Sequence, residues 1–162
     1  MNLIYIGDLV NTHGIKGEVR IISESEYKDK IFVKDHHLYI NDEQLTINTY
    51  RKHKCFDMVT FNEYSDINDV IKFKGLKVYA DKDEIVLNND ELFLNDYISM
   101  RCIYKNKTIG YIEDVINNNG YKLFLVNSKY IPMNDNFIEK VDIESKTIYF
   151  KNLEGLLWKL LF

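Results

Sequence analysis

The stretch NTHGIKGEVRI, residues 11–21, places His13 and Lys16 beside Gly14 and Gly17, a combination that could hold a phosphate group. A phosphate-binding P-loop needs the spacing G-x-x-x-x-G-K-[ST], which this stretch lacks. It also lies between two strand-like segments, so no helix N-terminus faces it. We therefore expect Gly14 and Gly17 to shape a tight connection between strands that presents His13 and Lys16 to a partner.

Two pairs of residues could ligate a metal ion. His36 and His37 are adjacent, and adjacent residues of a strand point to opposite faces. His53 and Cys55 share a face, but two ligands are fewer than the four of a structural zinc site. We expect neither a metal ion nor another cofactor.

The sequence carries no recognisable set of catalytic residues. No serine lies in a G-x-S-x-G motif, and neither Cys55 nor Cys102 belongs to a known nucleophile signature. The two cysteines form no C-x-x-C pair, which favours reduced thiols. No apolar run approaches the roughly 20 residues of a membrane span, and the N-terminus does not resemble a signal peptide. We expect a cytoplasmic protein that is not an enzyme and does not bind membranes.

The charge argues against a protein whose affinity comes from the nucleic-acid backbone. The chain of 162 residues carries 21 Lys and Arg against 25 Asp and Glu, a formal net charge of -4. Only three basic residues are arginines: Arg20, Arg51 and Arg101. A backbone-binding protein is expected to carry a basic excess. Direct RNA contact would depend on Lys16, Arg20 and Arg51.

Short strands dominate the first half of the chain. Runs rich in β-branched and aromatic residues, separated by polar turns, predict strands at 3–10, 17–23, 36–40, 45–53 and 58–64. A helix follows: Ser65 can cap it, Ile67, Val70 and Ile71 have helical spacing, and Gly75 can end it. A strand after the helix would complete a barrel or a sandwich, of which we favour the barrel.

An acidic, polar stretch at residues 81–91 is the best candidate for a linker. Strand patterns then resume at 97–104, 107–116, 121–127, 129–133 and 146–150. The predicted fold is therefore mostly β. It comprises two small barrels, residues 1–80 and 92–162, joined by a short linker at 81–91, with a short helix near the end of the first barrel.

Bulky side chains gather at two places in the second half. Leu92, Phe93 and Tyr97 follow the linker, where they could seal an interface between the barrels or anchor a partner. The apolar residues 156–162 could dock over an open barrel end or form a binding surface.

Four stretches carry a resemblance to the RimM family of ribosome maturation factors. IGDLVNTHGIKGEVRI (6–21) resembles the family's opening, and SDINDVIKFKGLKVY (65–79) resembles its helix and following strand. ELFLNDYISMRCIYKNKTIGYIEDV (91–115) resembles the start of its PRC-barrel, and IPMNDNFIEKVDIESKTIYF (131–150) with LEGLL resembles its end. The resemblance is collinear over nearly the whole chain.

The resemblance implies a translation-factor-like N-terminal barrel, a C-terminal PRC-barrel and a ribosome assembly chaperone. Such a factor binds the free 30S subunit through the head ribosomal protein usually numbered nineteen, and promotes 16S rRNA processing and head maturation. We expect a monomer that uses Leu92, Phe93 and Tyr97 as partner anchors and presents His13 and Lys16 on the N-terminal loop to rRNA or protein. The alternative is a direct rRNA-binding module that uses Arg20 and Arg51 of the first barrel.

The chain departs from the family pattern at two places. The family usually has two aromatic residues after the glutamate that corresponds to Glu91, whereas this chain has Leu92 and Phe93. No hydroxyl is present there, so Phe93 would contribute apolar anchoring alone. Trp158 also stands where an acidic residue is common.

Overall fold

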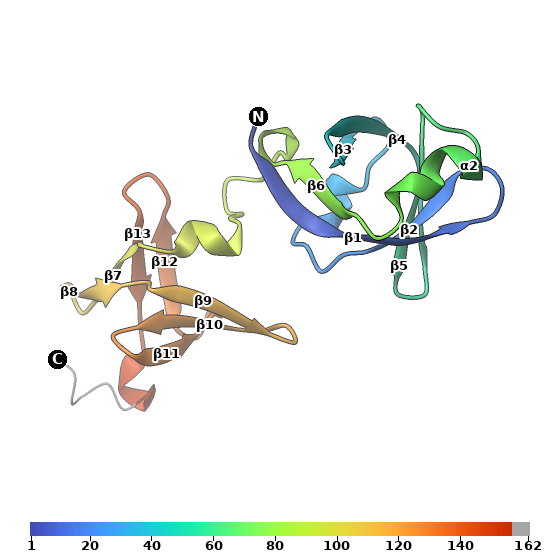
Figure 1. Ribbon diagram of the computed structural model, residues 1–162. Helices are drawn as coiled ribbons and strands as arrows, with labels where there is room; N and C mark the ends of the chain where they lie inside the picture. The colour runs from blue at the N-terminus through green and yellow to red at the C-terminus, as the bar shows by residue number, and fades with distance from the viewer. Residues whose placement is uncertain (157–162) are drawn as a thin grey trace. The chain divides into compact units, whose positions relative to one another are not determined.

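The computed structural model describes residues 1–156, and the chain forms two compact units, of which the first is Met1–Asn88 and the second begins at Asn89. Both units are built mainly of strands (Figure 1). The predicted mostly β fold is therefore confirmed.

The first unit is a closed six-stranded barrel, as predicted. Its strands follow one another around the barrel in the order β1-β2-β5-β4-β3-β6, and β6 pairs with β1 to close it. Inward side chains alternate with outward ones, as in β2, where Val19 and Ile21 are fully buried on either side of Arg20. The strands are β1 (Leu3–His13), β2 (Glu18–Ile22), β3 (His37–Ile40), β4 (Glu43–His53), β5 (Phe56–Phe61) and β6 (Lys77–Asp81).

The predicted helix is present, but its cap and its buried face differ from the prediction. It consists of α2 (Ile67–Val70) and one 3₁₀ turn, η1 (Ile71–Phe73). Asp66, not Ser65, caps it, because the Asp66 Oδ1 atom accepts the Asn68 N–H at 2.8 Å. The tightening after Val70 brings the residue three positions later onto the core side, so Phe73 is buried and Ile71 is 55% exposed.

Short helical turns also occur where the sequence indicated none. A four-residue helix, α1 (Lys28–Ile31), lies between β2 and β3, and a 3₁₀ turn, η2 (Lys82–Glu84), follows β6. Ile31 is buried, which attaches α1 to the core of the barrel. The His37 Nδ1 atom lies 2.6 Å from the Glu84 Oε1 atom and holds η2 beside β3.

The second unit places its strands in two sheets around one core. The sheets have the orders β11-β10-β9 and β12-β13-β7-β8, and β13 runs parallel to β7. The predicted single strand 107–116 is two strands, which lie in different sheets, and β12 was not predicted. The strands are β7 (Arg101–Tyr104), β8 (Lys107–Tyr111), β9 (Asp114–Asn118), β10 (Tyr121–Val126), β11 (Lys129–Pro132), β12 (Ile138–Asp142) and β13 (Thr147–Phe150).

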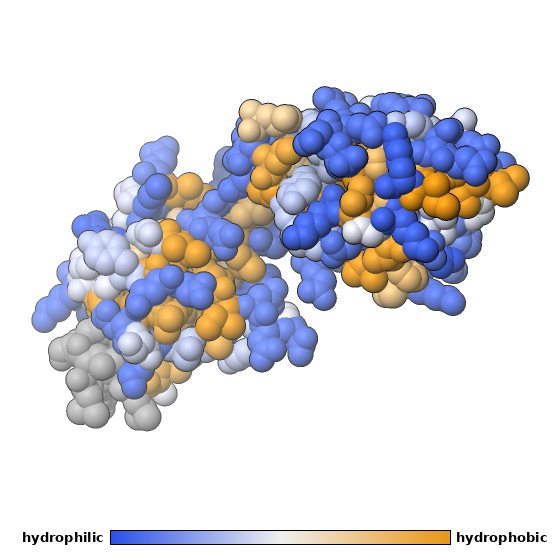
Figure 2. Space-filling view, in the orientation of Figure 1, coloured by the Kyte–Doolittle hydropathy of each residue, from blue (hydrophilic) through white to orange (hydrophobic). Residues whose placement is uncertain are grey.

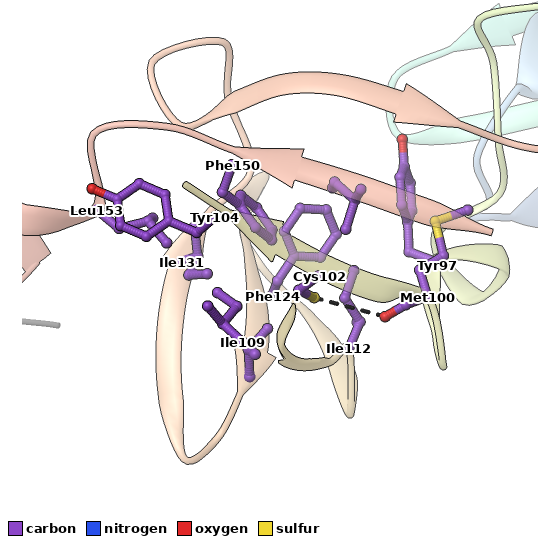
Figure 3. Close-up of a cluster of buried hydrophobic side chains, with 12 residues drawn as sticks. Tyr97, Met100, Cys102, Tyr104, Ile109, Ile112, Phe124, Ile131, Phe150 and Leu153 are labelled. Atoms are coloured by element: carbon purple, nitrogen blue, oxygen red, sulfur yellow. Dashed lines mark hydrogen bonds between the residues drawn. The ribbon is translucent and has the colours of Figure 1, made fainter. Parts of the chain in front are cut away.

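Aromatic rings fill the core of the second unit (Figure 3). The Phe124 ring centroid lies 5.2 Å from that of Tyr97 and 5.9 Å from that of Phe150. Cys102 is fully buried with its Sγ atom 3.7 Å from the Met100 carbonyl oxygen, and burial raises the pKa of its thiol to about 12. Cys102 therefore contributes packing and not reactivity.

The apolar C-terminal run is described only at its start. The turn η4 (Leu153–Leu156) places Leu153 fully buried in the second core, and Leu156 packs against the same core. Residues 157–162, which include Trp158 and most of the run expected to dock or bind, lie outside the described residues.

Hydrophilic side chains cover much of the visible face of each unit, and separate apolar areas lie among these hydrophilic side chains (Figure 2). Within residues 1–156, no helix is both long and apolar enough to cross a membrane.

Candidate partner-binding site

The loop between β1 and β2 has the tight geometry expected from its glycines. Gly14 and Gly17 have φ angles of +70° and +83°, a region that favours glycine. The Ile15 carbonyl oxygen accepts the Ile67 N–H at 3.1 Å, so the loop rests on the start of α2. Ile15 is 78% exposed and Lys16 is also exposed, so the tip presents both side chains to solvent.

Two arginines beside this loop are hydrogen bonded within the barrel. The Arg51 Nε and Nη2 atoms donate to the two carboxylate oxygens of Glu18 at 2.9 and 2.7 Å. This bidentate contact lowers the pKa of Glu18 and raises that of Arg51. The Arg20 Nη2 atom donates to the His13 Nδ1 atom at 2.7 Å. The two arginines proposed as RNA contacts thus already have partners.

The Arg20 contact also sets the tautomer of the neutral His13 ring. A guanidinium group can only donate, so the Nδ1 atom must accept, and the proton of the neutral ring lies on Nε2. The His53 ring centroid is 6.4 Å from that of His13. Sequence reasoning considered His53 only with Cys55 and missed this neighbour, which the β2–β5 pairing brings close. We call His13, Glu18, Arg20, Arg51 and His53 the hairpin cluster.

The hairpin cluster supplies hydrogen-bonding and charged groups that could contact a partner. It joins two imidazole rings, two guanidinium groups and one carboxylate from strands β1, β2 and β4. Within the described part of the chain, no three His, Cys, Asp or Glu side chains are arranged to hold a metal ion.

The other predicted contact residues lie in the second unit. Phe93 and Tyr97 are 7% and 8% exposed, and Tyr97 belongs to the second core. Leu92 is half-buried and packs against the same core. The turn η3 (Leu94–Tyr97) begins where an Asp96 carboxylate oxygen accepts the Phe93 N–H at 3.3 Å. Contact of these three side chains with a partner stays a prediction, and a test must separate lost binding from lost folding.

A surface that the sequence did not reveal covers the other side of the β11-β10-β9 sheet. Phe124 and Val126 of β10 point into the core, so Tyr121, Leu123 and Leu125 point away from it. Strand pairing places further residues on the same side, because directly paired residues share a face. This outer sheet face consists of Asp114, Ile116, Asn118, Tyr121, Leu123, Leu125, Tyr130 and Pro132.

The outer sheet face has the composition of a protein-binding surface. Tyr121 and Tyr130 are 60% and 51% exposed, Leu123 and Leu125 are half-buried between them, and Asp114 is its one charged member. Tyrosine is common where proteins meet, because its large ring loses little conformational entropy on binding. Sequence reasoning missed this face because the register of three strands determines it.

Comparison with known proteins gives matches over both units. The family model described as the RimM N-terminal domain matches residues 4–85, and the model described as the RimM PRC barrel domain matches residues 94–156. A ribosome maturation factor RimM from Staphylococcus haemolyticus is 35% identical, over 95% of this chain and 98% of its own. Another from Exiguobacterium is 29% identical, over 97% and 98%. A crystal structure of a 16S ribosomal RNA processing protein RimM from Pseudomonas aeruginosa aligns with a TM-score of 0.47 at 15% identity, over 93% of this chain and 98% of the other.

Proposed function

Because this chain belongs to the RimM family of ribosome maturation factors, which are not enzymes, we propose that it assists maturation of the small ribosomal subunit and processing of its 16S rRNA. The observation that carries the proposal is the succession of two family models, one on each unit, in a chain that spans nearly the full length of its relatives. The protein acts as an assembly chaperone, which binds the unfinished 30S subunit and leaves the finished one.

The partner on the 30S subunit is a protein of its head, the one usually numbered nineteen. The net charge of -4 supports a protein partner, because an acidic factor is attracted to a basic ribosomal protein. The outer sheet face supplies an apolar and aromatic surface for such a contact, with Asp114 at its edge. Phe93 and Leu92 act as further anchors, and His13 and Lys16 meet neighbouring rRNA or protein.

Direct recognition of rRNA by the first barrel has weaker support. Arg51 is held by Glu18, and Arg20 is held by His13, so phosphate binding would have to replace both contacts. A phosphate-binding surface would also make affinity fall steeply as salt concentration rises.

Deletion of the gene tests the function as a whole. We expect unprocessed 16S rRNA to accumulate and free 30S subunits to increase relative to 70S ribosomes, with both defects restored by the wild-type gene. Normal 16S rRNA ends and a normal subunit profile in the deletion strain would contradict the proposal.

Binding to the purified head protein tests the partner. We expect Tyr121→Ser combined with Tyr130→Ser to weaken binding at least tenfold, while Tyr111→Ser leaves it unchanged. Tyr111 is a matched control, because it is 56% exposed and belongs to β8 of the other sheet. Equal affinities for all variants would exclude the outer sheet face.

Phe93→Ala separates an anchor from a core residue. We expect weaker binding to the head protein from a variant that is still folded at the temperature of the binding assay. A collapse of thermal stability would identify Phe93 as a core residue and would contradict its role as an anchor.

Binding to an rRNA fragment without the head protein, with a steep salt dependence, would instead favour the RNA-binding alternative.

A further inference from the structure

A pocket on the first barrel lies apart from the hairpin cluster. It has a volume of about 400 Å³, and we call it the β1 pocket. Its lining consists of Tyr5, Ile6, Gly7, Asp8, Ile22, Glu24 and Ser25.

The backbone fixes the shape of the β1 pocket. The register of β1 shifts against β6 between Tyr5 and Gly7, so β1 bends at this point. Gly7 lies so close to β2 that an added Cβ atom would be 2.3 Å from the Ile22 carbonyl oxygen. The Ser23 hydroxyl donates to the Ile6 carbonyl oxygen and holds the end of β2 against β1. The pocket is therefore part of the barrel wall and is preorganised.

The lining combines an apolar wall with negative charge. Ile22, which is 41% exposed, supplies aliphatic surface, while Asp8 and Glu24 supply two carboxylates, and no Lys, Arg or His is among the described residues that line the pocket. The Tyr5 hydroxyl donates to the Asp8 Oδ2 atom at 2.6 Å, which fixes both side chains. This bond raises the pKa of Tyr5, and the charge of Glu24 adds to the effect.

The Tyr5 ring already lies close to one cation. The Lys77 Nζ atom is 5.6 Å from the ring centroid, within the range of a cation–π contact. A long basic side chain fits the lining of the β1 pocket, because its methylene stem packs on apolar surface while its charged head reaches the carboxylates. A phosphate group, by contrast, would be repelled by both carboxylates.

We propose that the β1 pocket binds a lysine or arginine side chain of a basic protein partner. The aliphatic stem lies against Ile22 and the Tyr5 ring, and the cationic head is held by Asp8 and Glu24. The occupant follows from charge complementarity: the lining carries two negative charges and no positive charge among its described residues. This inference goes beyond the proposed function, because the protein could mature ribosomes with or without this contact.

Titration of the full-length ¹⁵N-labelled protein tests the proposal. The probes are N-acetyl-arginine amide and N-acetyl-lysine amide, and the neutral control is N-acetyl-citrulline amide, which has nearly the shape of the arginine probe. We expect saturable shifts of the amide signals of Gly7, Asp8 and Ser25 with the basic probes and none with the citrulline probe. Absence of localised shifts with either basic probe would overturn the proposal.

Variants test whether the two carboxylates cause the binding. Asp8→Asn combined with Glu24→Gln should weaken it at least tenfold, while Asp35→Asn with Asp69→Asn, which removes two exposed charges elsewhere on the barrel, should change it less than twofold. Lys77→Gln removes a nearby positive charge and should strengthen binding about twofold to fivefold, by the size of an exposed charge interaction. Equal weakening by both double variants would show a general charge effect and would overturn the proposal.

A spermidine titration separates a side chain from a free polyamine. Shifts of the same amides at lower concentrations of spermidine than of the arginine probe would make the pocket a polyamine site and would overturn the assignment to a protein partner. The gene-deletion result is independent of these titrations, so failure of the pocket and failure of the proposed function can be distinguished.

Discussion

At the scale of single residues, Asp57 is the one fully buried charged side chain among the described residues of the first barrel. Its side chain is fully buried, with the Lys28 Nζ atom 2.8 Å from Oδ2 and the Tyr50 hydroxyl donating to Oδ1 at 2.7 Å. Burial and this contact with Asp57 raise the pKa of Tyr50 to about 12. Asp57 thus connects α1 to strands β4 and β5.

Asp57→Asn should lower the free energy of unfolding by about 2–4 kcal/mol, because it leaves the Lys28 ammonium group without its buried counter-charge. Urea unfolding monitored by circular dichroism measures the change. Asp69→Asn, an exposed carboxylate of the same domain, is the control and should stay within about 0.5 kcal/mol of the wild type. Equal stability of the two variants would show that the buried ion pair contributes nothing.

The Glu18–Arg51 contact predicts a pH dependence of stability. Arg51 holds the pKa of Glu18 below its ordinary value of 4.5, so the contact stabilises the folded state fully above that pH. Its contribution disappears as the pH falls through the lowered pKa. The thermal midpoint of Glu18→Gln should lie a few degrees below that of the wild type between pH 5 and 7, and the gap should narrow as the pH falls below 4.5.

Glu139→Gln, at an exposed position of β12, is the control for this comparison. It should follow the wild-type thermal midpoint throughout the pH range. A gap between Glu18→Gln and the wild type that stays constant down to pH 3 would argue against a role for the Glu18 charge.

At the scale of elements, three glycines differ in what a methyl group would meet. A Cβ atom at Gly7 would collide with the Ile22 backbone. At Gly14 there is space for a Cβ atom, but the positive φ angle is unfavourable for alanine. At Gly155 there is space for a Cβ atom and φ is not positive. Gly7→Ala should therefore force β1 and β2 apart and cost about 3 kcal/mol or more. Gly14→Ala should cost about 1 kcal/mol, and Gly155→Ala should be within about 0.5 kcal/mol of neutral.

Urea unfolding of the three glycine variants measures this order. A Gly7→Ala protein as stable as Gly155→Ala would show that the two strands separate at little cost. That result would also remove the reason for regarding the β1 pocket as preorganised.

Local patterns predicted most elements, and they failed where the decisive contact is distant in sequence. Alternation of apolar and polar residues identified the barrel strands, and the loop glycines indicated a tight β1–β2 connection. The run 107–116 looks like one strand because β-branched and aromatic residues continue on both sides of Ile112, where the chain leaves one sheet for the other, and Gly110 lies inside β8 and not at that point. Glu139 and Lys140 hide the strand pattern of β12.

The candidate sites were less predictable than the strands for the same reason. Glu18 and Arg51 are 33 residues apart, and only the barrel brings them together. The outer sheet face depends on the register of β9, β10 and β11, which a single sequence does not encode locally. The sequence could nominate Lys16 for the loop tip, but it could not show that Arg20 and Arg51 are already hydrogen bonded.

At the scale of the whole molecule, the chain contains two compact units with separate cores. We expect two calorimetric transitions from the full-length protein. Asp57→Asn should lower one of them, and Ile148→Ala, which opens a cavity in the second core, should lower the other by more than about 10 °C. A single transition that both variants shift equally would show that the units unfold as one.

The strand pairings that close each unit also set the order in which the protein can fold during its own synthesis. The barrel closes when β6 pairs with β1, Asp81 opposite Leu3, so the first unit can be completed while the second is still being translated. The second unit needs β13 beside β7, Thr147 opposite Arg101, and must wait until nearly all of its residues have left the exit tunnel. A ribosome that stalls between these two points would therefore carry a finished barrel followed by an unfinished, exposed core.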